Sequence, residues 1–268
     1  RHRIAKYIFM DADFLVLNPA LASRALETFN SYWECALSDK CRVQIPMEMA
    51  QPSDDPTAAK TLVALKSKAK EYTESRKYPR KYKPIHAGVL VAKSAMVAYV
   101  ENTMFPREIS GKLLYEEPSQ HGAEIVRLIN ALPSQAEIVI HNAYLFFPAE
   151  IQKALMDALQ RGIGVVIQTN SPASSDLGYV AMAARLQYRH LMALAKPGQL
   201  KIYEYFTQES LHTKVWIIGD SITVGSVNAD PRCHWLDTGN SLVINPVPGA
   251  ASLASAYKNW VAKLREEL

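Results

Sequence analysis

The chain contains the same short pattern twice, which limits its possible folds to those built from two similar units. Residues 15–19 read Leu-Val-Leu-Asn-Pro and residues 242–246 read Leu-Val-Ile-Asn-Pro. In each copy a tryptophan, Trp33 or Trp260, follows the proline by 14 residues across a stretch with apolar residues at helical spacing. Proline is favoured at the first position of a helix, where no N–H is needed. The pattern predicts a strand ending in Asn-Pro and then a helix, used twice by duplication.

Beyond residue 110 the sequence alternates between strand and helix patterns. The predicted strands are 137–141, 164–168, 200–205, 211–218 and 221–226, and the predicted helices are 148–161 and 176–195. Gly162 and Pro197-Gly198 end the two helices, because glycine and proline are frequent just beyond helix ends. This alternation predicts an α/β fold, a layered sheet with flanking helices.

Residues 38–110 interrupt the alternation. Several prolines near Asp54 and Asp55 indicate an irregular connector, and residues 66–83 hold eight basic residues interspersed with tyrosines. The basic stretch is typical of a solvated linker helix. The alternative is a patch that contacts anionic lipid head groups, where each basic residue contributes about 1 kcal/mol. We therefore predict three segments: 1–37 as the end of a first half, 38–110 as a connector and basic linker region, and 111–268 as a second half.

Composition narrows the class of protein. The chain is 49% hydrophobic and 21% charged, which is typical of a globular protein. No run of about 18 apolar residues predicts a membrane span. The three cysteines lack metal-ligand spacing and predict reduced thiols in an intracellular protein. A formal net charge of +4 permits an anionic partner without requiring one.

Residues 211–228 carry the groups most suited to chemistry. His212 and Lys214 stand two apart on a predicted strand, so their side chains should share one face. A turn at Gly219-Asp220 would return the chain and bring Ser226 and Asn228 beside them. Cationic and neutral donors of this kind hold phosphodiester oxygens, while an imidazole forms a covalent bond or transfers a proton. The alternative for an isolated His-x-Lys is a core histidine and a surface lysine on an edge strand.

The repeat also predicts where the chain begins. The second copy is preceded by His212-Thr213-Lys214, and the same offset puts its counterpart about 15 residues before Arg1. We therefore expect the chain to start inside the first copy, after its chemical motif, and to hold half of a paired site.

Several of these segments resemble the phospholipase D superfamily. Residues 211–228 are similar to its His-x-Lys-x-x-x-x-Asp motif with a trailing Gly-Ser-x-Asn. Residues 225–232 read Gly-Ser-Val-Asn-Ala-Asp-Pro-Arg and resemble the Gly-Ser-Phe-Asn-x-Asp-Pro-Arg run of cardiolipin synthases. Residues 169–171 read Thr-Asn-Ser, and residues 9–33 resemble the stretch after the family's first motif. The resemblance covers most of the chain and is weakest over 40–110.

The resemblance implies a fold and a mechanism. The fold would be a phospholipase D-like layered sheet with flanking helices, in two pseudo-twofold-related halves, the first of them incomplete. One His-Lys pair from each half would meet at the seam between the halves. One histidine would take the phosphatidyl group covalently, and the other would protonate the leaving alcohol.

The resemblance also assigns roles to residues of this chain. His212 would be the general acid and Lys214 would hold a phosphate oxygen. Asp11 would hydrogen-bond His212 and fix its imidazole, with Asp13 as the alternative. The residues expected to bind substrate are Ser226, Asn228 and Asn170. His141 ends a predicted strand, and we count it as a further candidate to line the site.

The chain departs from the family pattern at two acidic positions. The motif acid would stand seven residues after His212, where this chain has Gly219, so Asp220 becomes the candidate acid. A glutamate expected after the second motif is replaced by Gly239. These departures leave a catalytically weakened, lipid-binding relative as an alternative.

The resemblance favours an enzyme that transfers or hydrolyses phosphatidyl groups of a phospholipid substrate. A nuclease of the same superfamily is a second alternative, which predicts a basic cleft and strong salt dependence. We expect peripheral contact with an anionic membrane, with nucleic acid less favoured as a partner. No cofactor and no metal are expected. The predicted location is the cytoplasm or the periphery of the inner membrane of a bacterium.

Overall fold

The computed structural model describes residues 8–11, 14, 16–37, 67, 95–102, 108–109, 112–113, 119–206, 209–235, 237–248 and 252–267. The chain divides into two units, residues 1–26 with 90–268, and residues 27–89. Of the second unit, the described residues are 27–37 and 67. The predicted basic stretch at 66–83 therefore lies outside the described residues, apart from Ser67.

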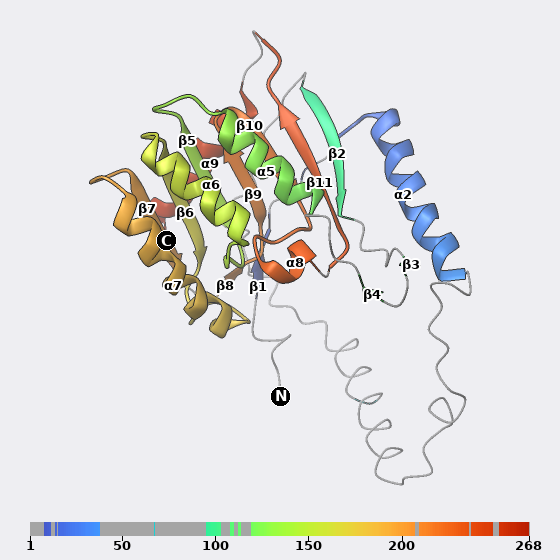
Figure 1. Ribbon diagram of the computed structural model, residues 1–268, viewed down its shortest axis with the longest axis horizontal. Helices are drawn as coiled ribbons and strands as arrows, with labels where there is room; N and C mark the ends of the chain where they lie inside the picture. The colour runs from blue at the N-terminus through green and yellow to red at the C-terminus, as the bar shows by residue number, and fades with distance from the viewer. Residues whose placement is uncertain are drawn as a thin grey trace. The chain divides into compact units, whose positions relative to one another are not determined.

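A mixed sheet forms the centre of the first unit (Figure 1). In the described part of the chain it has seven strands, in the order β2 (Met96–Asn102), β11 (Gly239–Asn245), β10 (Ser221–Gly225), β9 (Lys214–Ile218), β5 (Glu137–Asn142), β6 (Gly164–Asn170) and β7 (Leu200–Tyr205). Strands β5, β6 and β7 run parallel, and the other pairs are antiparallel. A separate small hairpin joins β3 (Glu108–Ile109) to β4 (Lys112–Leu113).

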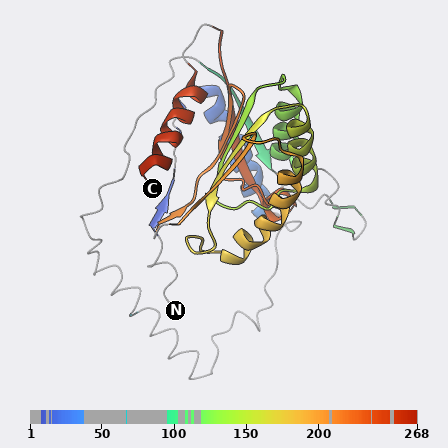
Figure 2. The ribbon, with the colours of Figure 1, turned by 90° about the vertical axis from the view of Figure 1, so that its left-hand side faces the viewer.

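Helices cover both faces of this sheet. One face carries α5 (Gln120–Ala131), α6 (Ala149–Gln160) and α7 (Gly178–Leu194), and the other carries α9 (Leu253–Glu267), as Figure 2 shows. Parallel strands require crossover connections, which α6 and α7 provide. Among the helices in the described residues, none combines the length and apolar character needed to cross a bilayer. These layers confirm the predicted α/β fold.

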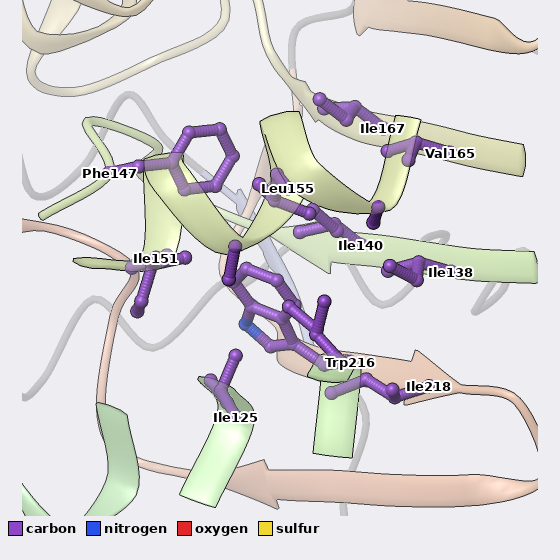
Figure 3. Close-up of a cluster of buried hydrophobic side chains, with 14 of the residues drawn as sticks. Ile125, Ile138, Ile140, Phe147, Ile151, Leu155, Val165, Ile167, Trp216 and Ile218 are labelled. Atoms are coloured by element: carbon purple, nitrogen blue, oxygen red, sulfur yellow. The ribbon is translucent and has the colours of Figure 1, made fainter. Parts of the chain in front are cut away.

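The main core lies between the sheet and the helices α5, α6 and α7 (Figure 3). Trp216 of β9 is fully buried there, and its ring meets Phe147 edge-on at a centroid distance of 6.0 Å. Strands β5 and β6 are buried along almost their whole length, as expected for strands covered on both faces. Each fully buried aliphatic or aromatic side chain stabilises the fold by about 1.5–3 kcal/mol.

Most of the predicted elements are present. The predicted strand 200–205 matches β7, and the helix predicted at 148–161 matches α6 to within one residue at each end. The prediction of one strand over 211–218 was wrong, because β8 (Glu209–Leu211) ends before His212 and β9 begins at Lys214. The predicted segment boundaries stay predictions. Strand β2 lies within the predicted connector 38–110, yet it pairs with β11 at the edge of the sheet.

The two copies of the repeat form different local structures. In the second copy β11 ends at Asn245 as predicted, but α9 begins only at Leu253. In the first copy α2 (Pro19–Leu37) begins directly at the proline, and the described residues Val16 and Leu17 are not in a strand. The two asparagines explain the difference. Asn18 Oδ1 accepts the N–H groups of Ala20 and Leu21 as a helix cap, whereas Asn245 Oδ1 accepts the Ser221 hydroxyl.

Candidate active site

A short parallel pairing brings together two residues that lie 201 positions apart in the sequence. Strand β1 (Ile8–Met10) pairs with β8, and Met10 lies opposite Leu211. Asp11 directly follows β1 and His212 directly follows β8, so the parallel register of the two strands places these residues side by side. Asp11 Oδ2 lies 2.9 Å from His212 Nδ1, and both side chains are partly exposed. The contact predicted between Asp11 and His212 is present. Asp13 lies outside the described residues.

This contact decides which ring nitrogen of His212 is the basic one. A carboxylate accepts hydrogen bonds, so Nδ1 of His212 donates to Asp11. In the neutral ring the proton then resides on Nδ1, and Nε2 carries the lone pair. An imidazole held in one tautomer and one orientation by a carboxylate is suited to proton exchange at Nε2.

Lys214 lies beside His212, although the two residues do not share the face of one strand as predicted. The chain leaves strand geometry at His212 and Thr213, and Lys214 is the first residue of β9. Its Nζ donates to the carbonyl oxygen of His212 at 2.6 Å. The Thr213 hydroxyl donates to the carbonyl of His141 at 3.1 Å, which anchors this break to β5. The two motif residues are therefore linked through backbone and side chain.

Lys214 is partly buried and lies near several acidic side chains. Burial lowers the pKa of the Lys214 ammonium, while Asp11 first, and then Cys233, Asp176 and Asp230, raise it. Several carboxylates thus act on one partly buried cation. Because the effective dielectric constant is lower than in water, such an ammonium interacts strongly with any anion that reaches it.

Asn170 holds the backbone that precedes His212. Its Oδ1 accepts the Leu211 N–H at 2.7 Å, and its Nδ2 donates to the Leu211 carbonyl at 2.8 Å and to the Ala143 carbonyl at 3.1 Å. The side chain is buried. Asn170 was predicted to bind substrate, but its amide is bound to protein backbone, because β6 ends directly beside β8. These hydrogen bonds hold the backbone beside His212 in place, and substrate binding by Asn170 stays a prediction.

The two other predicted substrate-binding residues lie beyond the end of β10. Ser226 is exposed, and its hydroxyl accepts the Asn240 N–H at 3.0 Å, toward β11 and away from β9. Asn228 is half-buried, with Nδ2 3.6 Å from Cys233 Sγ. Its Oδ1 is buried and has no hydrogen-bond partner among the described residues. Binding of substrate by Ser226 and Asn228 stays a prediction.

Asp220 cannot replace the missing motif acid at His212. It is exposed in the turn between β9 and β10, at the opposite end of β9 from Lys214. Five residues of strand span roughly 16 Å. Gly219 stands at the family's acid position with a φ of 62°, and a Cβ there would lie 2.8 Å from Leu132 Cδ2. The first position of such a two-residue hairpin turn requires a positive φ, which glycine adopts more readily than a residue with a side chain.

Sequence reasoning gave no role to Tyr144 and Asp176, which lie beside the motif. The Tyr144 hydroxyl donates a short hydrogen bond to Asp176. Burial raises the pKa of Tyr144, and Asp176, Asp230 and Tyr179 raise it further. Asp176 also acts on Lys214, so this pair borders the site. The run that resembles cardiolipin synthases includes Asp230, but no pattern in the sequence marked Tyr144.

His141 is part of the core and does not line the site. Its ring is buried, with Nδ1 3.0 Å from the Tyr257 hydroxyl and Nε2 3.4 Å from the Tyr205 hydroxyl. The Trp260 ring packs against it at a centroid distance of 6.2 Å. The prediction that it lines the site was therefore wrong, because this end of β5 is covered by α9 and β7. Burial lowers the pKa of His141 to about 3.

This burial predicts how stability depends on pH. The unfolded chain protonates His141 below about pH 6.5, whereas the folded protein keeps it neutral down to about pH 3. The unfolded state thus binds more protons in this window, and the free energy of unfolding falls as the pH is lowered. One such group contributes a slope of up to about 1.4 kcal/mol per pH unit. Urea denaturation of the wild type and His141→Gln between pH 7 and 4 measures it, and parallel slopes for the two proteins would contradict the prediction.

Part of this chain is similar in sequence to known proteins. The family model described as cardiolipin synthase, PLD-like domain, matches residues 126–264. Cardiolipin synthase B of Shigella flexneri is 31% identical over 150 residues, which cover 54% of this chain and 34% of that protein. Cardiolipin synthase A of Pectobacterium carotovorum is 30% identical over 169 residues, 56% of this chain and 33% of that protein. The chain spans about a third of the length of these curated relatives.

A solved structure supports the fold. The phosphatidylserine synthase of Haemophilus influenzae aligns with a TM-score of 0.51 at 18% identity, covering 80% of this chain and 47% of that one. Within the described residues, no group of three or more His, Cys, Asp or Glu side chains could hold a metal ion. The family model spans more than half of the chain, across the segment that contains His212, Lys214 and the Gly-Ser-x-Asn run. The chain belongs to the cardiolipin synthase, phospholipase D-like domain family.

Proposed function

We propose that the protein transfers or hydrolyses the phosphatidyl group of a phospholipid, with His212 exchanging the proton of the alcohol. The observation that carries this proposal is the 2.9 Å contact between Asp11 Oδ2 and His212 Nδ1, with Lys214 alongside. A carboxylate-oriented imidazole beside an ammonium is a general acid–base group next to a donor for a phosphate oxygen. Relatives named cardiolipin synthase support a lipid phosphodiester as the substrate.

The proposed reaction has two steps. A second imidazole, from the other His-x-Lys motif of the family pattern, attacks phosphorus, and the P–O bond to the leaving alcohol breaks. His212 gives its proton to that alcohol oxygen, which leaves a phosphohistidine. In the second step His212 takes a proton from the acceptor, which attacks phosphorus and releases the nucleophilic histidine. Water as acceptor gives hydrolysis, and an alcohol gives transfer.

Product analysis tests this proposal directly. The full-length protein is incubated with phosphatidylglycerol vesicles, and the lipid products are separated by mass. Phosphatidic acid indicates hydrolysis, and a diphosphatidyl product with free glycerol indicates transfer. Cleavage of an oligonucleotide without any turnover of lipid would overturn the assignment in favour of a nuclease.

Replacement of Asp11 by asparagine is expected to lower turnover by at least about tenfold, because the amide no longer enforces the Nδ1-protonated tautomer of His212. Its matched control is Asp220→Asn, the same change at an exposed carboxylate at the far end of β9, which should leave turnover unchanged. Steady-state rates over a range of pH measure both variants. If Asp11→Asn retains the rate and the pH profile of the wild type, the 2.9 Å contact has no role in catalysis.

A further inference from the structure

Helix α7 has an apolar side that is exposed in the described part of the chain. Tyr179, Met182 and Leu186 are exposed by 69%, 63% and 61%, and their spacing places them on one side of the helix. The exposed Ala193 continues the same stripe, and these four residues are called the α7 outer face. The opposite side is buried in the core through Ala181, Ala184, Tyr188 and Leu191. A soluble amphipathic helix has a polar outer side, so this apolar stripe needs an explanation.

The charged residues of α7, counting Asp, Glu, Lys and Arg, are all basic. Residues 178–194 contain Arg185 and Arg189 but no aspartate or glutamate, and Lys196 follows the helix end. All three basic side chains are exposed. Arg185 donates to Glu204 of β7 at 3.0 Å. Among the described residues, Arg189 and Lys196 form no ion pair with a carboxylate. An apolar stripe flanked by arginine and lysine is typical of a helix that lies in a lipid interface.

The α7 outer face begins at the edge of the candidate active site. Strand β6 ends at Asn170, which holds the backbone before His212, and α7 starts eight positions later at Gly178. A Cβ on Gly178 would lie 2.8 Å from the Pro172 carbonyl oxygen, so the intervening turn is tight. Asp176 in this turn binds the Tyr144 hydroxyl, and Tyr179 is near enough to act on Tyr144. A surface lying against α7 would therefore also reach the site.

We propose that the α7 outer face docks on the surface of an anionic phospholipid bilayer, with Tyr179, Met182 and Leu186 inserted among the head groups. The proposal rests on the proposed function, because a lipid substrate has to reach His212 from such a surface. Arginine and lysine at the rim match the negative charge of the lipid, and their aliphatic stems cover apolar surface while their charges stay in water. The occupant is thus a bilayer of matching charge, and docking of a second copy of this chain is the competing outcome.

Vesicle sedimentation tests the docking without any turnover. The full chain is mixed with vesicles of phosphatidylglycerol and phosphatidylcholine in equal parts, and separately with vesicles of phosphatidylcholine alone. Binding is expected to the anionic vesicles and to weaken as salt is raised, since exposed charges are screened. Met182→Asp should bind about tenfold more weakly, because it puts a charge into the inserted stripe. Leu186→Ser serves as the second variant, and circular dichroism melting checks that both remain folded.

The matched control is Met96→Asp. Met96 is 58% exposed on β2, at the opposite edge of the sheet from β7, and should bind vesicles like the wild type. His212→Ala should also bind normally, which separates docking from catalysis. The proposal would be overturned if the wild-type protein did not bind anionic vesicles. It would also be overturned if Met182→Asp and Met96→Asp bound them equally well. A loss of dimer mass in Met182→Asp by light scattering with vesicle binding intact would overturn it as well, and would assign the face to a contact between copies.

Discussion

Replacement of His212 by alanine in the full-length protein is expected to lower phosphodiester turnover by about 10²–10⁴-fold. The physical reason is loss of the proton donor to the leaving alcohol, since Nδ1 of His212 is bound to Asp11 and Nε2 is the basic nitrogen. The substrate for this measurement is a soluble short-chain phospholipid with an alcohol leaving group, so that the proton donor is needed and membrane docking does not influence the rate. Near-wild-type turnover by the folded variant would remove His212 from the mechanism.

Chemical rescue makes this test specific for the imidazole. His212→Gly leaves space at the end of β8, and added imidazole should restore part of the lost rate if a proton-exchanging ring is what was removed. Quenching during turnover with an alkaline denaturant then locates the covalently bound substrate phosphate, because the P–N bond of a phosphohistidine is stable in alkali and labile in acid. Label on a histidine other than His212 agrees with the acid–base role, whereas label on His212 itself would make it the nucleophile and reverse the proposed roles.

The elements that could be predicted from sequence are strands made of buried apolar runs and elements with a clear local signal at their ends. Strands β5 and β6 are short apolar runs that are buried, and glycines with positive φ, Gly162 and Gly198, separate β6 and β7 from the preceding helices. Such signals are local, so a single sequence contains them. The Asp11–His212 contact was also predictable, but only through the repeat and the family resemblance, because a contact across 201 positions leaves no local trace.

The predictions that failed depended on contacts between distant segments. Periodicity placed His212 and Lys214 on one strand, yet Asn170 pulls the chain at Leu211 toward β6 and ends β8 there. His141 was predicted to end a strand that points toward the site, but Tyr205 and Tyr257 enclose its ring. In both cases the deciding partner comes from an element far along the chain.

The hydrogen bond between Tyr144 and Asp176 could not be predicted from the sequence, because its two partners are also far apart along the chain. The Tyr144 hydroxyl meets Asp176 across 32 positions, and although Asp176 follows the Thr-Asn-Ser segment that resembles the family, no pattern pairs it with Tyr144. The turn at Gly219 is the opposite case. A missing acid suggested a weakened site, whereas the positive φ and the lack of room for a Cβ beside Leu132 explain the glycine by geometry at the turn.

Replacement of Trp216 by alanine is expected to lower the free energy of unfolding by about 3–5 kcal/mol, the usual cost of emptying a large aromatic site in a core. Trp216 lies on β9 between Ile140 of β5 and Thr223 of β10, and its ring fills the space beneath Phe147. Urea denaturation followed by circular dichroism measures the effect as a lower midpoint with an unchanged slope.

Two further tryptophan variants show whether the loss arises from the core. The indole Nε1 of Trp216 is buried and has no hydrogen-bond partner among the described residues. Trp216→Phe removes that unpaired donor while keeping an aromatic ring, so it should cost clearly less than alanine, since the lost donor offsets part of the cavity. Trp33, 58% exposed on α2, is the matched control, and Trp33→Ala should change stability by less than about 1 kcal/mol. Equal losses for Trp216→Ala and Trp33→Ala would mean that β9 is not at the centre of the core. In that case the sheet could not hold Lys214 in a fixed place beside His212.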